Sequence, residues 1–413
     1  MAHRFSFGLS RELWLVEAGI FLNYFGYGAV LPFEIIYLHF GRGFSLGTAG
    51  LVIGLITGVA VVTAPLVGPW IDRFGARAIA TGGGVALAAG YAGLAFAHTP
   101  AWAFVAAALA GAGNGALSPS QSTLLAALAP PELRHRATAV SRVASNAGIG
   151  LGGALGGLIA SYGLTGFVLL FLANAFTYLA YVFVLVSVVR DDVRPKPIVG
   201  GYRLMMRDRA FLHLACINVA MIAVGWGVFT WLVPLYAKAE IGISETQIGL
   251  LLLANAAAVV AAQLPIARFA EGRRRVLMVA MAAAIFANAC MLVVAAGVSA
   301  VTAYAALVAA AIAVGVGECF HTTVLMPLVA DLAPTSLRGR YMATMGLSWW
   351  VGLALAPTLG TQMLSLSPTA TFLAAAAVSI AAGTSALALE RRLPETSRLT
   401  PHPPGESAKT NAS

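Results

Sequence analysis

Charged residues are scarce in this sequence. Asp, Glu, Lys and Arg make up 10% of the chain, whereas 59% of its residues are hydrophobic and the mean hydropathy is +0.85. A soluble globule with this composition would leave much of its apolar surface in water. The composition therefore excludes an ordinary soluble protein and predicts a chain that crosses a membrane several times.

Cysteines and catalytic motifs are also scarce. The three cysteines, Cys216, Cys290 and Cys319, lie in apolar segments without CxxC spacing, so we expect neither a disulfide framework nor a metal site. The chain has no HExxH pattern, which argues against a zinc-dependent membrane enzyme, and no GxxxxGK[ST] loop for ATP. We therefore expect no enzymatic activity, no ATP-driven pumping by this chain alone and no cofactor.

Long hydrophobic runs, in contrast, are plentiful. A helix rises about 1.5 Å per residue, so roughly 20 apolar residues cross a bilayer of about 30 Å. The first run is too long for a cleaved signal, and no small-residue cleavage site follows it. We predict an all-α membrane protein with twelve transmembrane helices, at 13–39, 47–70, 78–97, 101–129, 137–161, 165–189, 211–237, 246–270, 276–297, 301–330, 341–365 and 370–389.

Positive charge is distributed unevenly between the connections. If both termini are cytoplasmic, every Lys and Arg except Arg42 and Lys238 falls on the inner side. The positive-inside rule predicts this orientation. The net charge of +9 then reflects topology rather than a nucleic-acid partner. We expect a multi-pass protein of the cell (cytoplasmic) membrane, in contact with the lipid bilayer and with both termini in the cytoplasm.

The two halves of the chain repeat each other. LAPPELRHR at 128–136 recurs 204 residues later as LAPTSLRGR at 332–340. At a displacement of 199 residues, four positions of the first half match the second: Tyr37, Gly43, Ser45 and Gly50 match Tyr236, Gly242, Ser244 and Gly249. Each copy has six helices, an even number, so both have the same orientation. Parallel repeats are one way to build a secondary transporter, with its substrate site near the bilayer midplane.

The repeat also predicts the domain boundaries. We expect an N-terminal six-helix bundle at 1–189 and a C-terminal six-helix bundle at 211–389. Between them, 190–210 is polar and basic, which predicts a cytoplasmic linker on the membrane surface. The segment 390–413 is rich in Pro, Ser and Thr, so we expect a disordered cytoplasmic tail.

The loop between the second and third predicted helices carries the most specific motif. It reads GPWIDRFGAR at 68–77 and contains Gly68, Asp72, Arg73, Gly75 and Arg77. This resembles the G-x-x-x-D-R-x-G-R-R signature of the major facilitator superfamily, at the loop where that family carries it, with alanine in place of one final basic residue. The resemblance implies that these glycines allow close helix approach and a tight turn. It also implies charge contacts that form and break as the inner gate closes and opens. A plain basic loop is the alternative.

The fifth predicted helix carries a second motif. Its glycines are Gly148, Gly152, Gly153, Gly156 and Gly157. They resemble the antiporter motif G-x-x-x-G-P-x-x-G-G of the same family, with glycine at the proline position. Small residues at this spacing make a helix face flat enough for close packing, and such packing alone is the plainer explanation.

In topology the resemblance covers nearly the whole chain and points to the twelve-helix drug:proton antiporter branch. One feature departs from it, because Ala110 stands about where such antiporters often carry an arginine in helix 4. The resemblance implies a secondary-active, proton-coupled exporter of lipophilic or cationic small molecules (multidrug efflux), working by alternating access. We expect a monomer. A proton symporter or uniporter for sugars, amino acids or other small metabolites is the alternative, and a non-transporting sensor stays open.

Ionisable groups inside the apolar runs are costly, so each one is a candidate for proton coupling or substrate binding. Glu318 lies near the middle of 301–330, and we expect it to couple protons or to recognise a cation. Gly315 and Gly317 precede it and would let a neighbouring helix or a cargo molecule approach. His321, three residues further on, either hydrogen-bonds Glu318 or is held by a backbone carbonyl.

The first helix supplies two more carboxyl groups. Glu17 lies about one turn from the cytoplasmic end, where an inner-gate arginine or interfacial water is the expected partner. Glu34 follows Pro32 towards the outer end, where it lies either in the transport cavity or at the membrane interface.

Several aromatic and amide side chains lie at mid-depth in the predicted helices. Such a lining suits lipophilic or aromatic cationic cargo, although packing against lipid or neighbouring helices is the alternative. The candidates are Asn23, Tyr24 and Tyr27 in the first helix, Asn218 and Trp226 in the seventh, and Trp349 in the eleventh.

Overall fold

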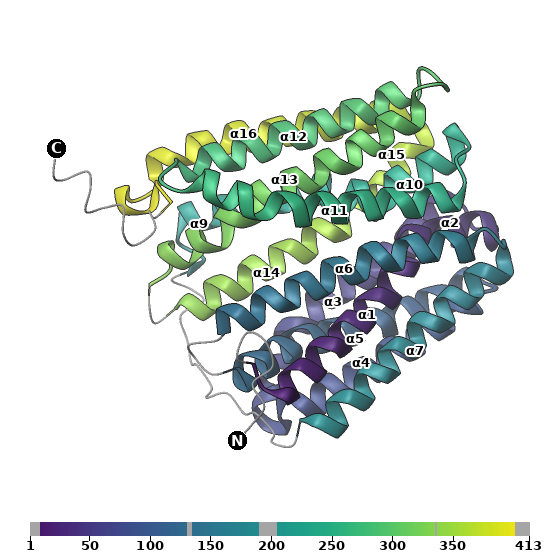
Figure 1. The fold of residues 1–413 in the computed structure, drawn as a ribbon, viewed down its shortest axis with the longest axis horizontal. Coiled ribbons are helices and arrows are strands. Elements are labelled where there is room, and N and C mark those ends of the chain that lie inside the picture. Colours follow the sequence, from purple (N-terminus) through teal and green to yellow (C-terminus); the bar gives the residue numbers. More distant parts are fainter. Residues whose placement is uncertain (1–8, 130–133, 190–204, 335–336, 401–413) are drawn as a thin grey trace. The chain divides into compact units, whose positions relative to one another are not determined.

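The computed structural model describes residues 9–129, 134–189, 205–334 and 337–400 (Figure 1). Among these residues, twelve helices are long and apolar enough to cross a membrane. They are Arg11–Gly41, Leu46–Ile71, Ala76–Ala95, Pro100–Leu125, Val140–Ala160, Leu164–Val188, Arg209–Ile241, Glu245–Ala270, Arg275–Ala296, Ala303–Leu332, Arg340–Leu366 and Pro368–Arg392. The predicted all-α fold with twelve spanning helices is confirmed, and each predicted segment corresponds to one of them.

Most first-repeat spans are single helices, but the first is interrupted. It runs through α1 (Arg11–Val30), a 3-10 turn η2 (Leu31–Phe33), α2 (Glu34–Ile36) and a π-turn η3 (Tyr37–Gly41). The others are α3 (Leu46–Phe74), α4 (Ala76–Ala95), α5 (Pro100–Leu128), α6 (Arg134–Ala160) and α7 (Leu164–Val188).

The second repeat has two interrupted spans. One runs through α9 (Arg209–Ile222), η5 (Ala223–Leu232), α10 (Val233–Tyr236) and η6 (Ala237–Ile241), and the other through α14 (Arg338–Leu355), η7 (Ala356–Gly360) and α15 (Thr361–Leu366). The single helices are α11 (Glu245–Ala270), α12 (Arg275–Ala296), α13 (Ala303–Leu332) and α16 (Pro368–Leu389).

The predicted repeat is visible in local geometry where the first span of each half ends. Both spans finish in a π-turn, at η3 and at η6. A glycine with positive φ follows each turn, Gly43 with φ 73° and Gly242 with φ 77°. Glycine adopts this left-handed conformation without the steric cost that a Cβ brings. The two halves therefore stop their first span by the same means.

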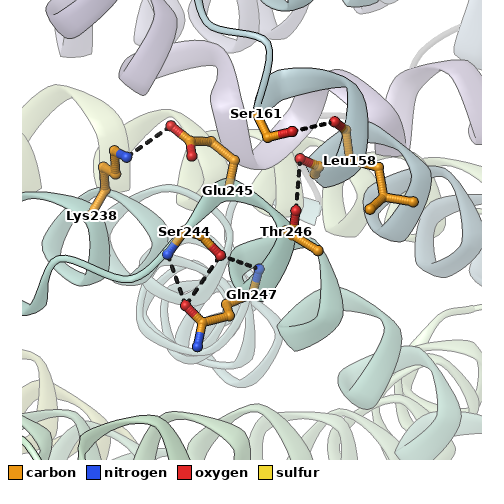
Figure 2. Close-up of polar contacts among 8 residues, drawn as sticks. Leu158, Ser161, Lys238, Ser244, Glu245, Thr246 and Gln247 are labelled. Atoms are coloured by element: carbon orange, nitrogen blue, oxygen red, sulfur yellow. Dashed lines mark hydrogen bonds and ion pairs between the residues drawn. The ribbon is translucent and has the colours of Figure 1, made fainter.

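Matching serines start the next helix of each half. The hydroxyl oxygen of Ser45 accepts a hydrogen bond from the backbone N–H of Thr48 at 3.2 Å, and that of Ser244 accepts one from Gln247 at 3.2 Å (Figure 2). Each bond satisfies a backbone donor that the first turn of a helix leaves free. Ser45 also lies in a Gly-x-Ser-x-Gly pattern at 43–47, and its role there is that of a helix cap.

Contacts between residues divide the chain into two compact units. The first contains Met1–Ile198, Thr230–Ala256 and Ala354–Leu366, and the second contains Val199–Phe229, Ala257–Leu353 and Ser367–Ser413. Parts of three second-repeat spans are thus packed with the first-repeat helices in unit 1. The predicted linker at 190–210 lies, up to residue 204, outside the described residues.

The segment predicted to be disordered, 390–413, is partly ordered. Two 3-10 turns, η8 (Glu390–Arg392) and η9 (Glu395–Ser397), follow α16, and Leu399 forms a β-bridge with Arg274. The prediction was wrong for 390–400, because composition does not reveal backbone pairing with a distant loop. Residues 401–413 lie outside the described residues.

Three glycines give α6 a flat face against α1 in unit 1. A Cβ built on Gly148, Gly152 or Gly156 would lie 2.1 to 2.8 Å from a carbonyl oxygen of α1. Real Cβ atoms do not come that close to backbone, so alanine at these positions would push the helices apart.

A second face of α6 packs on the start of α11, also in unit 1. A Cβ on Gly157 would lie 2.5 Å from the carbonyl oxygen of Glu245, and one on Gly153 would lie 3.0 Å from the side chain of Leu252. Figure 2 shows the start of α11 beside the end of α6, where the Thr246 hydroxyl donates to the Gly157 carbonyl at 3.5 Å. Glycine replaces the family's proline at a position that is itself a close contact.

The tight α6–α1 contact predicts a sharp difference between two glycine-to-alanine substitutions. Gly152→Ala should lower the free energy of unfolding by about 1–3 kcal/mol, because the new methyl group would lie 2.1 Å from the carbonyl oxygen of Phe25. Gly82→Ala on α4 is the matched control, since its Cβ would meet nothing within 4 Å. Unfolding in detergent measures both, and equal stability of the two variants would contradict the contact.

Candidate functional site

Glu34 accepts hydrogen bonds from two buried side chains of unit 1. Its Oε1 accepts a hydrogen bond from the hydroxyl of Tyr91 on α4 at 2.9 Å. Its Oε2 accepts one from the indole N–H of Trp231 on η5 at 3.0 Å. The Glu34 side chain is only 1% exposed. One buried carboxyl group therefore joins a first-repeat helix to a second-repeat span inside a single unit.

A break in the first span precedes Glu34. Pro32 has no backbone N–H, so the α-helical ladder cannot continue through it. The chain passes through the tighter 3-10 turn η2 and resumes as α2, with Glu34 as its first residue. The turn changes the direction in which Glu34 projects compared with an uninterrupted helix.

Aromatic rings pack against Tyr91, one of the two donors to Glu34. Tyr91 stacks on Tyr178 of α7, with ring centroids 5.7 Å apart and planes inclined by 25°. Its centroid lies 6.1 Å from that of Phe171. All three rings are buried. The hydroxyl of Tyr91 is therefore held in place by ring packing on α7.

No positive charge balances Glu34 among the residues that the structure describes. The ion pairs Lys238–Glu245 at 2.9 Å, Arg275–Asp331 at 2.6 Å and Arg274–Glu390 do not involve it. Two neutral donors replace part of the hydration of Glu34, but they supply no counter-charge. A carboxyl group in such a place is costly as an ion and suited to carrying a proton.

Glu17 is buried in the first half of α1. Its Oε1 accepts a hydrogen bond from the hydroxyl of Ser141 on α6 at 2.6 Å. Its Oε2 has no hydrogen-bond partner within the described part of the chain. The partner that the structure gives Glu17 is thus a serine rather than the predicted arginine or interfacial water.

Glu318 and His321 lie on α13 in unit 2. Glu318 is half-buried, and its carbonyl oxygen accepts a hydrogen bond from the hydroxyl of Thr322 at 2.8 Å. His321 is buried, and its Nε2 finds no partner among the described residues. Gly317 admits a neighbouring helix as predicted, because its Cβ would lie 2.5 Å from the ring of Phe286 on α12.

Three of the predicted lining residues lie in unit 2, and two of them are in contact. The rings of Trp226 on η5 and Trp349 on α14 have centroids 5.9 Å apart, with planes inclined by 56°. Asn218 donates to the hydroxyl of Ser348 at 2.7 Å, while its buried Oδ1 has no partner in the described residues. The aromatic pair and the partly satisfied amide are thus two contacts between the same two spans.

The other three lining residues lie on α1 in unit 1. Asn23 is buried, and its Oδ1 finds no hydrogen-bond partner in the described ranges. Tyr24 and Tyr27 are half-buried. The part that these three play in cargo binding stays a prediction.

The loop motif at 68–77 is only partly as expected. Gly75 has φ 89° and joins α3 to α4, as a tight turn requires. Arg77 donates to the carbonyl oxygen of Val186 at 2.9 Å, in the last turn of α7, and Arg73 lies over the ring of Phe74. A Cβ on Gly68 would meet nothing within 4 Å, so this glycine is not a packing contact here. The side chain of Asp72 lies outside the described part of the chain.

Sequence reasoning missed both donors to Glu34. Tyr91 and Trp231 lie 57 and 197 residues from Glu34 in the chain, and neither belongs to a motif. A polar-tipped aromatic residue inside an apolar segment is a weak signal, because a buried Tyr or Trp usually needs some hydrogen-bond partner. That signal does not say which partner.

The sequence matches the model of a known protein family over nearly its whole length. The model described as Major Facilitator Superfamily matches residues 16–232 and 215–412, nearly the whole chain. The chain belongs to the major facilitator superfamily. With twelve candidate spans among the described residues, this major facilitator protein is a multi-pass membrane protein of a transporter family.

Curated relatives of this major facilitator chain match over part of their length. The uncharacterised transporter YttB of Bacillus subtilis is 36% identical over 178 residues, 43% of either chain. The multidrug resistance protein MdtH of Aeromonas hydrophila is 27% identical over 259 residues, 62% of this chain and 64% of that protein. MdtH of Escherichia coli O1:K1 is 29% identical over 192 residues. The chain thus spans less than two thirds of these relatives' lengths.

Solved structures share the fold at low sequence identity. A POT family transporter in complex with 5-aminolevulinic acid has a TM-score of 0.79 and 15% identity, covering 95% of this chain and 98% of that one. A bacterial homologue of the human lysosomal transporter Spinster, inward-facing and occupied, has a TM-score of 0.73 and 14% identity, covering 94% and 98%. At this identity the likeness shows the major facilitator fold with its two repeats and nothing about cargo.

The two donors to Glu34 predict a loss of stability when one of them is removed. Trp231→Phe should lower the free energy of unfolding by about 1–3 kcal/mol, because a buried acceptor loses its donor. Unfolding of the detergent-solubilised protein measures it. Trp102→Phe is the control, since that indole donates to the Gly93 carbonyl and not to an acid.

Proposed function

We propose that this chain exports lipophilic or cationic small molecules across the cell membrane in exchange for protons, by alternating access and with both termini in the cytoplasm. One observation carries the proposal. A buried carboxyl group without a counter-ion in the described residues, Glu34, is hydrogen-bonded by one donor from each repeat. A carboxyl group in that position can couple the gain or loss of its proton to a movement that separates the two donors.

Contacts at the same end of unit 1 support this link. A Cβ on Gly50 would lie 2.0 Å from the Thr361 hydroxyl, and one on Gly54 would lie 1.9 Å from the Thr358 hydroxyl. These contacts join α3 to η7 and α15, at the end that the charge distribution predicts to be extracytoplasmic. To open this end, the protein must separate these contacts and the Glu34–Trp231 hydrogen bond together.

The proposed cycle follows from the energy of a buried charge. While Trp231 covers Glu34 and no cargo is bound, the carboxyl group keeps a proton, because an uncompensated ion there would be costly. When the outer contacts separate, water reaches Glu34 and the proton exchanges with the outside. Cargo that binds from the inside displaces this proton inwards, so that one cycle exchanges cargo for protons.

The aromatic pair in unit 2 supports a lipophilic or cationic cargo. Trp226 and Trp349 offer π-faces, which attract cations, and Asn218 offers an amide oxygen. The multidrug resistance proteins among the relatives carry names that agree with such cargo. Glu318 is a second candidate for the proton-coupling acid, with His321 beside it in sequence.

The proposal is tested by transport into proteoliposomes under an imposed pH gradient, with ethidium as the lipophilic cation. Glu34→Gln should lower proton-driven ethidium transport at least about tenfold, because an amide cannot exchange the proton, a change of about 1.4 kcal/mol or more in coupling. Facilitated ethidium movement down its own gradient should remain.

The matched control is Glu12→Gln, an exposed carboxyl group in the first helical turn of the same membrane span. Glu318→Gln should be measured beside it. If Glu34→Gln drives ethidium as fast as the parent protein while Glu318→Gln does not, the coupling acid is Glu318. If neither change matters, proton coupling through these acids is wrong, and a uniporter of small metabolites becomes the better account.

The loop motif predicts a change in rate rather than affinity. Arg77→Ala removes the hydrogen bond between the start of α4 and the last turn of α7. Ethidium turnover should fall several-fold, while the concentration for half-maximal binding stays within about twofold, since the cargo-contacting residues are untouched. Arg11→Ala, an exposed arginine on α1 in the same repeat, is the control. A weakened affinity with unchanged turnover would show that the loop does not act as a gate.

A further inference from the structure

The segment 390–400, here called the strap, follows α16 and pairs with the loop between α11 and α12. The backbone N–H of Gly272 donates to the carbonyl oxygen of Thr400 at 3.2 Å, and the N–H of Thr400 donates to that of Arg273 at 3.0 Å. The N–H of Arg275 donates to the carbonyl oxygen of Arg398 at 2.8 Å. Backbone pairing of this kind fixes the strap in one register. The whole contact lies within unit 2.

The strap supplies what the start of α12 lacks. The N-cap residue, Arg274, makes no side-chain cap bond, so the first N–H groups of the helix need another acceptor. The Arg398 carbonyl provides one. Arg274 and Arg275 also bring positive charge to the positive end of the helix dipole, which is unfavourable. Glu390 of the strap offsets part of this charge, since its Oε1 lies 2.8 Å from Nε of Arg274.

Burial shows that the strap packs as well as pairs. Leu393 and Ser397 are each 2% exposed. Arg275 is 1% exposed and pairs with Asp331, at the end of α13, at 2.6 Å. The Thr400 hydroxyl donates to the carbonyl oxygen of Ala270, in the last turn of α11. Through these contacts the strap joins one end each of α11, α12, α13 and α16.

The first repeat has a simpler version of the same connection. There, Gly75 with φ 89° separates α3 from α4, and Arg77 of α4 is bonded to the last turn of α7. In the second repeat, Gly272 with φ 67° separates α11 from α12, and Arg274 is paired with Glu390 after α16. An arginine at the start of the third helix thus meets the end of the sixth in both halves. The strap adds backbone pairing to this connection in the second.

We propose that the strap is a conformational device that locks the α11–α12 loop, so that the cytoplasmic ends of α11, α12, α13 and α16 move as one body during the transport cycle. Alternating access needs such rigid movement, because a loop that frays would absorb the motion locally. Release of the strap loosens this end of the unit and slows turnover. The expected effect on turnover rests on the proposed transport function, whereas the locking of the loop does not.

Hydrogen–deuterium exchange of the full chain in detergent tests the lock without any transport assay. Thr400→Pro removes the Thr400 N–H and its hydroxyl, and should make amide exchange in 270–276 roughly tenfold faster, as expected for the loss of one or two hydrogen bonds. The loop at 72–78 serves as the internal reference and should not change. Glu390→Gln should give a smaller increase at 270–276, and Glu395→Gln, an exposed strap carboxyl group, should give none.

Ethidium turnover in proteoliposomes tests the consequence. Thr400→Pro should lower turnover several-fold with unchanged half-saturation, while Glu395→Gln matches the parent protein. If amide exchange at 270–276 is unchanged in Thr400→Pro, the strap does not lock the α11–α12 loop. If exchange is faster but turnover equals that of the parent protein, the locked loop plays no part in the transport cycle. If the parent protein itself shows no proton-driven transport, the proposed function fails while the exchange result still decides whether the strap locks the loop.

Discussion

A carboxyl group deep in an apolar helix bundle has to find hydrogen-bond donors in the protein, because lipid offers none. Glu34 finds one in each repeat, the Tyr91 hydroxyl and the Trp231 indole. The arrangement satisfies the carboxyl group only while both donors are in place. Movement of one repeat's helices past the other therefore changes the surroundings of the acid at once. This constraint connects the fold to the proposed chemistry.

The rest of unit 1 serves to bring helices close enough for that contact. Gly152 lets α6 lie against the backbone of α1, and Gly157 lets it lie against the start of α11. Helices without Cβ atoms at such points can approach closely. Close packing of this kind holds membrane helices together, because hydrophobic attraction between helices is weak in a membrane. The glycine pattern on α6 thus explains how parts of both repeats pack in one unit, around the span that carries Glu34.

The sequence predicted the fold well and the site only in part. Long apolar runs and unequal arginine distribution are strong signals, so the twelve spans and the two repeats could be read directly. Glu34 was recognised as a buried-acid candidate, but its partners were not, since contacts 57 and 197 residues apart leave no local pattern. Gly68 was misjudged because a family motif does not say which glycine meets a neighbour. The order of 390–400 was missed because backbone pairing with Gly272 and Arg273 depends little on side-chain type.

The central claim is that Glu34 exchanges a proton as cargo binds. The most direct measurement is proton release by the purified protein in weakly buffered detergent solution when ethidium is added. The parent protein should release protons in proportion to the ethidium bound, and Glu34→Gln should bind ethidium without releasing them. Equal proton release by both proteins would contradict the account.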